Sequence, residues 1–103
     1  MGSKPFVKEA MSIFKTDYDL IDVGWMQEVA NVLTIGAEKY DRFNWAKAKK
    51  NQLHLYRSAM IRHFEAYRRG EMLDPETGLS HLAHASCNLM FLHYLERKYN
   101  EPK

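Results

Sequence analysis

Apolar residues recur at helical spacing in three segments of the chain, and nowhere do apolar and polar residues alternate over the length of a strand. The first segment runs from about Trp25 to Tyr40 and predicts a main helix. Its apolar stripe consists of Trp25, Val29, Val32, Leu33 and Gly36. Because glycine inside a helix costs about 1 kcal/mol relative to alanine, Gly36 indicates close approach of a helix or a ligand.

The second segment predicts a helix from Asn51, as N-cap, to Arg69, where Gly70 stops it. Its inward stripe places His63 on the buried side. The members of that stripe are Leu53, Tyr56, Met60, His63 or Phe64, and Tyr67.

The third segment predicts a helix that Ser80 caps and that continues to about Tyr99. Only His93 is polar between Leu89 and Leu95, so this helix should be buried. The fold class is therefore all-α, a small bundle of three main helices.

The chain divides into an N-terminal arm, residues 1–23, and a helical domain, residues 24–103. The arm is too apolar for plain disorder, since it carries Phe6 and Phe14, and should pack on the body or on another subunit. A 12.1 kDa chain cannot easily bury these rings together with Trp25 and the aromatic residues of the second helix. We therefore expect oligomerisation to complete the bundle.

Composition fits one soluble globular domain, with 46% hydrophobic and 27% charged residues. No apolar run approaches the roughly 18 residues of a transmembrane helix, so no membrane partner is expected. The single cysteine, Cys87, lies in an apolar helix pattern and is interpreted as packing. Together these features favour a reducing, cytoplasmic setting.

Charge is segregated along the chain although the net charge is only +2. Eight basic residues and a single acid lie between Arg42 and Arg69, and Glu71, Asp74 and Glu76 follow at once. This order suits a polyphosphate held together with a cation. The alternative is that these residues are solvated faces of helices. Nucleic acid is not an expected partner, because the charges nearly balance and no docking motif appears.

Three histidines are predicted to face inward on successive helices. His81 and His84 lie three residues apart on one helical face, and His63 faces inward on the preceding helix. Imidazoles arranged in this way can bind one metal ion, and they suit Zn, Ni, Fe or Mn better than Mg. The competing interpretation is that they are core histidines satisfied by carbonyls or carboxylates.

A second group of candidates surrounds the end of the first helix. Glu38 could join the metal site, while Lys39 and Arg62 could hold phosphate. Asn44 and Trp45 could bind a nucleoside, the amide by hydrogen bonds and the ring by stacking. Trp45 could equally be a core anchor that ends the loop.

Several blocks of sequence resemble a known family. They are Tyr18-Asp-Leu-Ile21, Gly36-Ala-Glu-Lys-Tyr40, Asn44-Trp45, Arg62-His63, Gly70-Glu71, Asp74-Pro-Glu-Thr-Gly78 and His81-Leu-Ala-His84 with Asn88. In order and spacing they are similar to the bacteriophage dATP/dGTP diphosphohydrolase domain, usually placed near the MazG-like all-α nucleoside triphosphate pyrophosphohydrolases. The resemblance covers about residues 17–95.

This resemblance implies an α-helical homodimer or homotetramer that cleaves a purine deoxynucleoside triphosphate to monophosphate and pyrophosphate. It also implies a divalent metal, Mg or Mn. MazG-like enzymes bind Mg through Glu-x-x-Glu and Glu-x-x-Asp, whereas the last helix here carries His81-x-x-His84. Their metal ligands are therefore not transferred to this chain.

We accordingly expect a metal-dependent deoxynucleoside triphosphate diphosphohydrolase, acting in the cytoplasm of the infected host cell if a phage encodes it. The expected catalytic residues are His81, His84 and Glu76. The expected metal ligands are Glu38, His63, His81 and His84. The expected substrate-binding residues are Lys39, Asn44, Trp45 and Arg62. The alternative is a phage protein that sequesters a nucleotide like a sponge, without catalysis.

Overall fold

The computed structural model describes residues 15–100, which form three α-helices and three short 3-10 helices without a strand. The α-helices are α2 (Val23–Tyr40), α3 (Leu53–Arg68) and α4 (His81–Asn100). The 3-10 helices are η2 (Tyr18–Leu20), η3 (Asn44–Lys47) and η4 (Lys50–Gln52). The predicted all-α class is confirmed. Most of the expected arm, residues 1–14, lies outside the described residues.

Local capping interactions set where the helices begin. Ser80 caps α4 as predicted, since its Oγ accepts a hydrogen bond from the backbone N–H of Leu82 at 3.0 Å. The prediction that Asn51 caps α3 is wrong. The side chain of Gln52 accepts from the backbone N–H of Lys49 at 2.8 Å, which fixes η4 and delays the start of α3 to Leu53.

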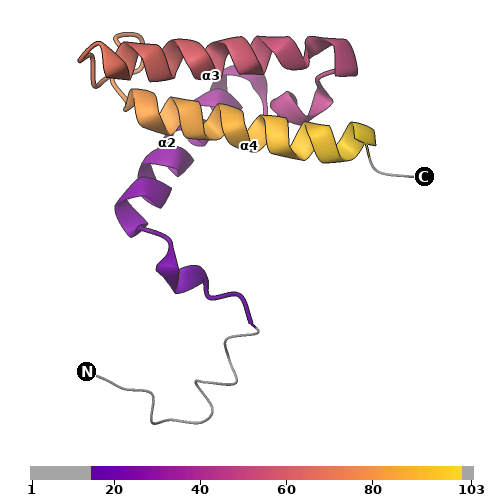
Figure 1. Ribbon diagram of the computed structural model, residues 1–103, viewed down its shortest axis with the longest axis horizontal. Helices are drawn as coiled ribbons and strands as arrows, with labels where there is room; N and C mark the ends of the chain where they lie inside the picture. The colour runs from indigo at the N-terminus through magenta and orange to yellow at the C-terminus, as the bar shows by residue number, and fades with distance from the viewer. Residues whose placement is uncertain (1–14, 101–103) are drawn as a thin grey trace.

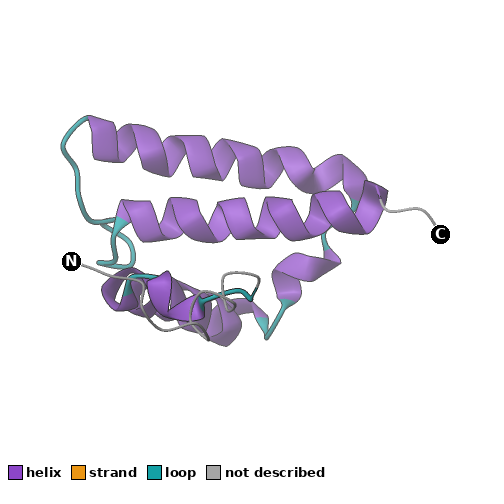
Figure 2. Ribbon diagram, turned by 60° about the horizontal axis from the view of Figure 1, so that its bottom comes forward, coloured by secondary structure: helices purple, strands orange, loops and turns teal. Residues whose placement is uncertain are grey.

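Helix α4 is the central element. It runs antiparallel to α3, and α2 packs on its other side, so α4 lies between the two (Figures 1 and 2). Small side chains allow the helices to approach closely, and Leu95 is the largest fully buried residue of the described part. The buried apolar residues are Leu53, Ala66, Ala83, Ala85, Cys87 and Leu95.

The predicted burial of the third helix is only partly confirmed. Helix α4 contains most of the buried residues of the described part, but much apolar surface stays uncovered in the single chain. Leu89 is 53% exposed, and α2 contains no fully buried residue. Phe64, expected as a member of the inward stripe of α3, is also exposed. The radius of gyration is 17.5 Å, compared with about 13 Å for a compact chain of this length.

The close approach of a helix that the sequence predicts at Gly36 is not seen among the described residues. Gly36 has no heavy atom within 4 Å of the position that a Cβ would occupy, so no helix of the described chain approaches it there. Instead, Gly36 lines the groove described below.

None of the helices in residues 15–100 has both the length and the apolar character needed to cross a bilayer.

Candidate functional site

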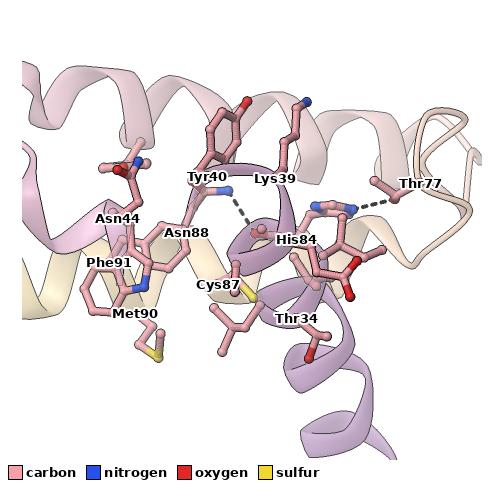
Figure 3. Close-up of a pocket in the computed structure, with 18 of the residues that line it drawn as sticks. Thr34, Lys39, Tyr40, Asn44, Thr77, His84, Cys87, Asn88, Met90 and Phe91 are labelled. Carbon is pink, nitrogen blue, oxygen red and sulfur yellow. Dashed lines mark hydrogen bonds between the residues drawn. The ribbon is translucent and has the colours of Figure 1, made fainter. Parts of the chain in front are cut away.

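A groove of about 1140 Å³ opens between the second half of α2 and the pair formed by α3 and α4 (Figure 3). One end is polar and includes His63, Asp74 and His84. The other end is rich in aromatic rings, among them Phe43 and Phe91. Figure 3 shows these two ends separated along α4, with His84 near one and Phe91 near the other. A volume of this size accommodates a ligand as large as a nucleotide.

The connection between α3 and α4 supplies the acids at the polar end. Gly70 has a φ of 100°, which lets the chain turn sharply after α3. An antiparallel bridge between Leu73 and Ser80 then closes the turn. Within it, the N–H of Asp74 donates to the carbonyl of Leu79 at 2.7 Å. Asp74 is therefore held by backbone hydrogen bonds close to the first turn of α4.

His81 joins two partners through its two ring nitrogens. Its Nε2 lies 3.1 Å from Oε1 of Glu71, and its Nδ1 lies 2.8 Å from Nδ1 of His63. A carboxylate can only accept, so Nε2 of His81 carries the proton in that hydrogen bond. His81 is buried, which leaves His63 as the member of this chain of contacts that lines the groove.

His84 belongs to a second chain of contacts. Asp74 Oδ2 accepts from both the N–H and the hydroxyl of Thr77, at 2.9 and 3.0 Å. The Thr77 hydroxyl has thus used its one proton, so His84 Nε2, 2.8 Å away, must donate to it. In neutral His84 the lone pair then lies on Nδ1. The series of contacts around His81 meets the series around His84 where the rings of His63 and His84 stack, with centroids 4.5 Å apart.

Burial controls the protonation of this cluster. It lowers the pKa of His63 to about 4, with further lowering by the neighbouring His84, and it also lowers the pKa of His84. Burial on its own would raise the pKa of Asp74, but the Thr77 hydrogen bonds and His84 outweigh it and lower that pKa. Near neutral pH the site therefore presents neutral His63 and His84 beside the ionised carboxylate of Asp74.

Among the described residues, one group has the geometry to hold a metal ion. It consists of His63, Asp74 and His81, whose ligand atoms all lie within 4.8 Å of one another. Asp74 belongs to this group although it was not among the predicted ligands, whereas Glu38 lines the groove wall on α2 outside the group. His84 is also outside it.

The expected substrate-binding residues are spread along the groove. Lys39, Arg62 and Asn44 all line it. Lys39 Nζ lies 3.6 Å from Oε2 of Glu76, and both side chains are exposed. Glu76 also lines the groove, and its charge acts to raise the pKa of His84.

Trp45 acts as an anchor for the groove wall. Its ring stacks on Phe91 with centroids 4.7 Å apart and contacts Tyr94 edge to face at 5.1 Å. Its Phe91-facing side is therefore occupied by packing, and Trp45 also lines the groove.

Three further residues at the site have contacts or surroundings that only the structure shows. Thr77 links Asp74 to His84, a contact for which a turn threonine gives no sequence signal. Asn88 donates from Nδ2 to the carbonyl of His84 at 2.9 Å and lines the groove; its position seven residues after His81 was the available signal. Cys87 is buried, and burial raises its pKa to about 12, which agrees with its interpretation as packing.

The sequence of this chain is similar to sequences of known proteins. Residues 7–103 match the family described as dATP/dGTP diphosphohydrolase, N-terminal. The chain belongs to this family. The matched range includes every residue of the histidine cluster and of the groove.

One protein with clear sequence similarity to this chain comes from Salmonella phage PMBT28 and is named dATP/dGTP diphosphohydrolase. It is 42% identical to this chain over 81 residues, which cover 79% of this chain and 27% of the relative. The chain therefore spans about a quarter of the length of that relative. No solved structure matches the chain.

Proposed function

We propose that the groove binds a purine deoxynucleoside triphosphate and hydrolyses it to monophosphate and pyrophosphate. One observation carries this proposal: three histidines and two acids converge at one end of a groove whose other end is aromatic. A nucleotide has the matching polarity, with phosphates at one end and a base at the other. The family and the name of the phage relative favour the same substrate class.

Phosphate binding is assigned to Lys39 and Arg62, which line the groove on opposite walls, α2 and α3. Tyr40 and Glu76 raise the pKa of Lys39, so its ammonium group stays charged at neutral pH. Phosphoryl transfer depends chiefly on positioning and on neutralising charge, which two flexible cations can supply.

We propose a divalent cation at His63, Asp74 and His81. Their ligand atoms fit one ion, because ligands 2.0–2.6 Å from a common centre lie no more than about 5 Å apart. A bound ion would replace the proton between Nδ1 of His63 and Nδ1 of His81, which frees the His81 lone pair for the metal. When bound, the cation neutralises negative charge on the phosphates. Two imidazoles and one carboxylate favour Mn over Mg.

The neutral histidines provide the proton acceptor for the attacking water. His84 keeps a lone pair on Nδ1 because its Nε2 donates to Thr77, and its pKa is lowered by burial. A neutral imidazole held in one tautomer is suited to act as a general base. Asp74 and Thr77 position this ring.

We also propose that the chain works as a homodimer or homotetramer. Exposed apolar side chains gather on α2 and α4 around a shallow hollow lined by Trp25, Leu89 and Met90. Uncovered apolar surface of this kind is typical of subunit interfaces. A second copy would cover it.

The rival function is nucleotide sequestration without cleavage. The two are separated by incubating the pure protein with each deoxynucleoside triphosphate in the presence of Mn or Mg and identifying the products. Release of pyrophosphate with dATP or dGTP is the expected result. Bound, intact nucleotide after prolonged incubation would instead establish the sponge.

A further inference from the structure

The turn between α2 and η3 holds two residues in an unusual backbone conformation. Asp41 has a φ of 101° and Phe43 a φ of 59°, and they are the two non-glycine residues with positive φ in the described part. A bulky aromatic residue is rarely found in the left-handed region, because its Cβ crowds the backbone. Such strained residues concentrate at ligand-binding sites, where the neighbouring structure holds them.

Neighbouring contacts keep Phe43 in place. The N–H of Asp41 donates to the carbonyl of Ala37 at 2.8 Å, which ties the turn to the end of α2. The N–H of Ala46 donates to the carbonyl of Phe43 at 3.0 Å, which starts η3. Next to it, Trp45 stacks on Phe91 and anchors η3 to α4.

The strained backbone presents an aromatic ring that the fold itself does not bury. Phe43 is 63% exposed and lines the groove. Its ring meets Trp45 edge to face at 6.3 Å, and the guanidinium of Arg42 lies 5.6 Å from its centroid. An apolar ring held open to solvent inside a groove is available to stack on a planar ligand.

The position along α4 fits the base of a nucleotide whose phosphates lie at the histidines. Phe91, which supports Trp45 beside Phe43, is seven residues after His84, or roughly 10 Å along the helix. Figure 3 shows Phe91 and His84 apart from each other along the wall of the groove. A nucleoside can bridge such a distance from base to 5′-phosphate.

We propose that Phe43 stacks on the purine base and thus fills the role that the sequence suggested for Trp45. This inference rests on the proposed function, because it needs a purine nucleotide in the groove. Trp45 supports the wall, whereas the ring of Phe43 makes the contact with the ligand.

Phe43→Gly gives the sharpest test, because glycine adopts a φ near 59° without strain and the ring alone is lost. Phe43→Trp keeps an aromatic face at the same site. Phe64→Ala is the matched control, since Phe64 is an exposed phenylalanine on α3 outside the groove. Calorimetric titrations with dATP, dGTP and inorganic tripolyphosphate are run in parallel, with thermal melts and sedimentation of each variant.

Phe43→Gly should weaken dATP and dGTP binding about 10- to 100-fold and leave tripolyphosphate affinity unchanged, as expected for loss of one stacking contact. Phe43→Trp and Phe64→Ala should bind both nucleotides as the wild type does. Unchanged nucleotide affinity in Phe43→Gly would overturn the stacking role while leaving the proposed function intact. An equal loss of tripolyphosphate affinity, or a changed oligomeric state, would also overturn it. A wild type that binds no purine nucleotide would overturn the proposed function and this inference together.

Discussion

The Nδ1 atoms of His63 and His81 lie 2.8 Å apart, so a proton can occupy only one of them. Because Nε2 of His81 donates to Glu71, neutral His81 has its lone pair on Nδ1 and accepts from His63. Neutral His63 must then keep its own lone pair on Nε2. A buried ring and an acid thereby set the proton arrangement of a ring that lines the groove.

His81→Ala should lower kcat for dATP and dGTP about 100-fold or more, a loss typical of removing a general acid–base group or its support. It should also lower the free energy of unfolding by about 1–3 kcal/mol, because it leaves His63 and Glu71 without their partner. Steady-state kinetics and denaturant unfolding measure the two effects. His54→Ala, at an exposed histidine of α3 that lines neither the groove nor the hollow, is the control and should behave as the wild type. An unchanged kcat in His81→Ala would leave the histidines as core packing.

Acid should destabilise the metal-free protein through His63. Its pKa is about 4 in the folded state and about 6.5 in the unfolded state. Between these values the unfolded chain binds the extra proton, so stability is fully present above pH 6.5 and is lost as the pH falls toward 4. His84, whose pKa is also lowered, contributes with the same sign. Melts of chelator-treated protein from pH 7 to pH 4 should show a falling Tm, and His63→Gln should reduce the slope. A slope equal to that of the wild type would refute this assignment.

Asp74→Asn should weaken Mn²⁺ binding about 10- to 100-fold, because it removes the negative charge from the proposed ligand group. In the wild type, Mn²⁺ should bind more tightly than Mg²⁺. Calorimetry with each ion alone measures both differences. Asp19→Asn, at an exposed site in η2, serves as the control. Equal affinities of wild type and Asp74→Asn would place the ion elsewhere.

Lys39→Ala should raise KM for the nucleotide about tenfold and change kcat little. The reason is that a phosphate contact present in both ground and transition states affects binding more than turnover. Lys47→Ala is a suitable comparison, since Lys47 is exposed on η3 and does not line the groove. Initial-rate kinetics across substrate concentrations separate the two parameters. A large fall in kcat at unchanged KM would assign Lys39 to the transition state alone.

Leu89→Arg should shift the protein toward monomer in sedimentation experiments at micromolar concentration. A charge in the centre of a covered apolar face is costly to bury. Leu55→Arg introduces the same charge at a similarly exposed leucine, 56% against 53%, but on α3 away from the hollow. That control should keep the wild-type oligomer. A monomeric wild type would contradict the proposed assembly.

Local signals in the sequence were enough for the helices. Hydrophobic spacing, Ser80 as a cap and Gly70 as a stop predict the ends of α3 and α4 to within two residues. They fail at Asn51, because the 3-10 turn there depends on a hydrogen bond from Lys49 to the Gln52 side chain.

The site was predicted less completely, because its contacts join residues from different elements. The inward phase of His63, His81 and His84 follows from periodicity, and the structure does bring these rings together. The proximity of Asp74 to His63 and His81, with Glu38 outside this group, depends on how the connection folds back onto α4, which no spacing rule encodes. The exposure of Phe43 likewise results from backbone torsions that the sequence does not signal.

Helix α2 forms one whole wall of the groove and yet contains no fully buried residue. Few buried contacts mean a small free energy of local opening, so its amides should exchange with solvent faster than those in the core of α4. If a second copy covers the apolar face of α2, assembly and ligand affinity become thermodynamically linked. The nucleotide would then bind more tightly as the protein concentration rises, and its presence would in turn tighten the oligomer.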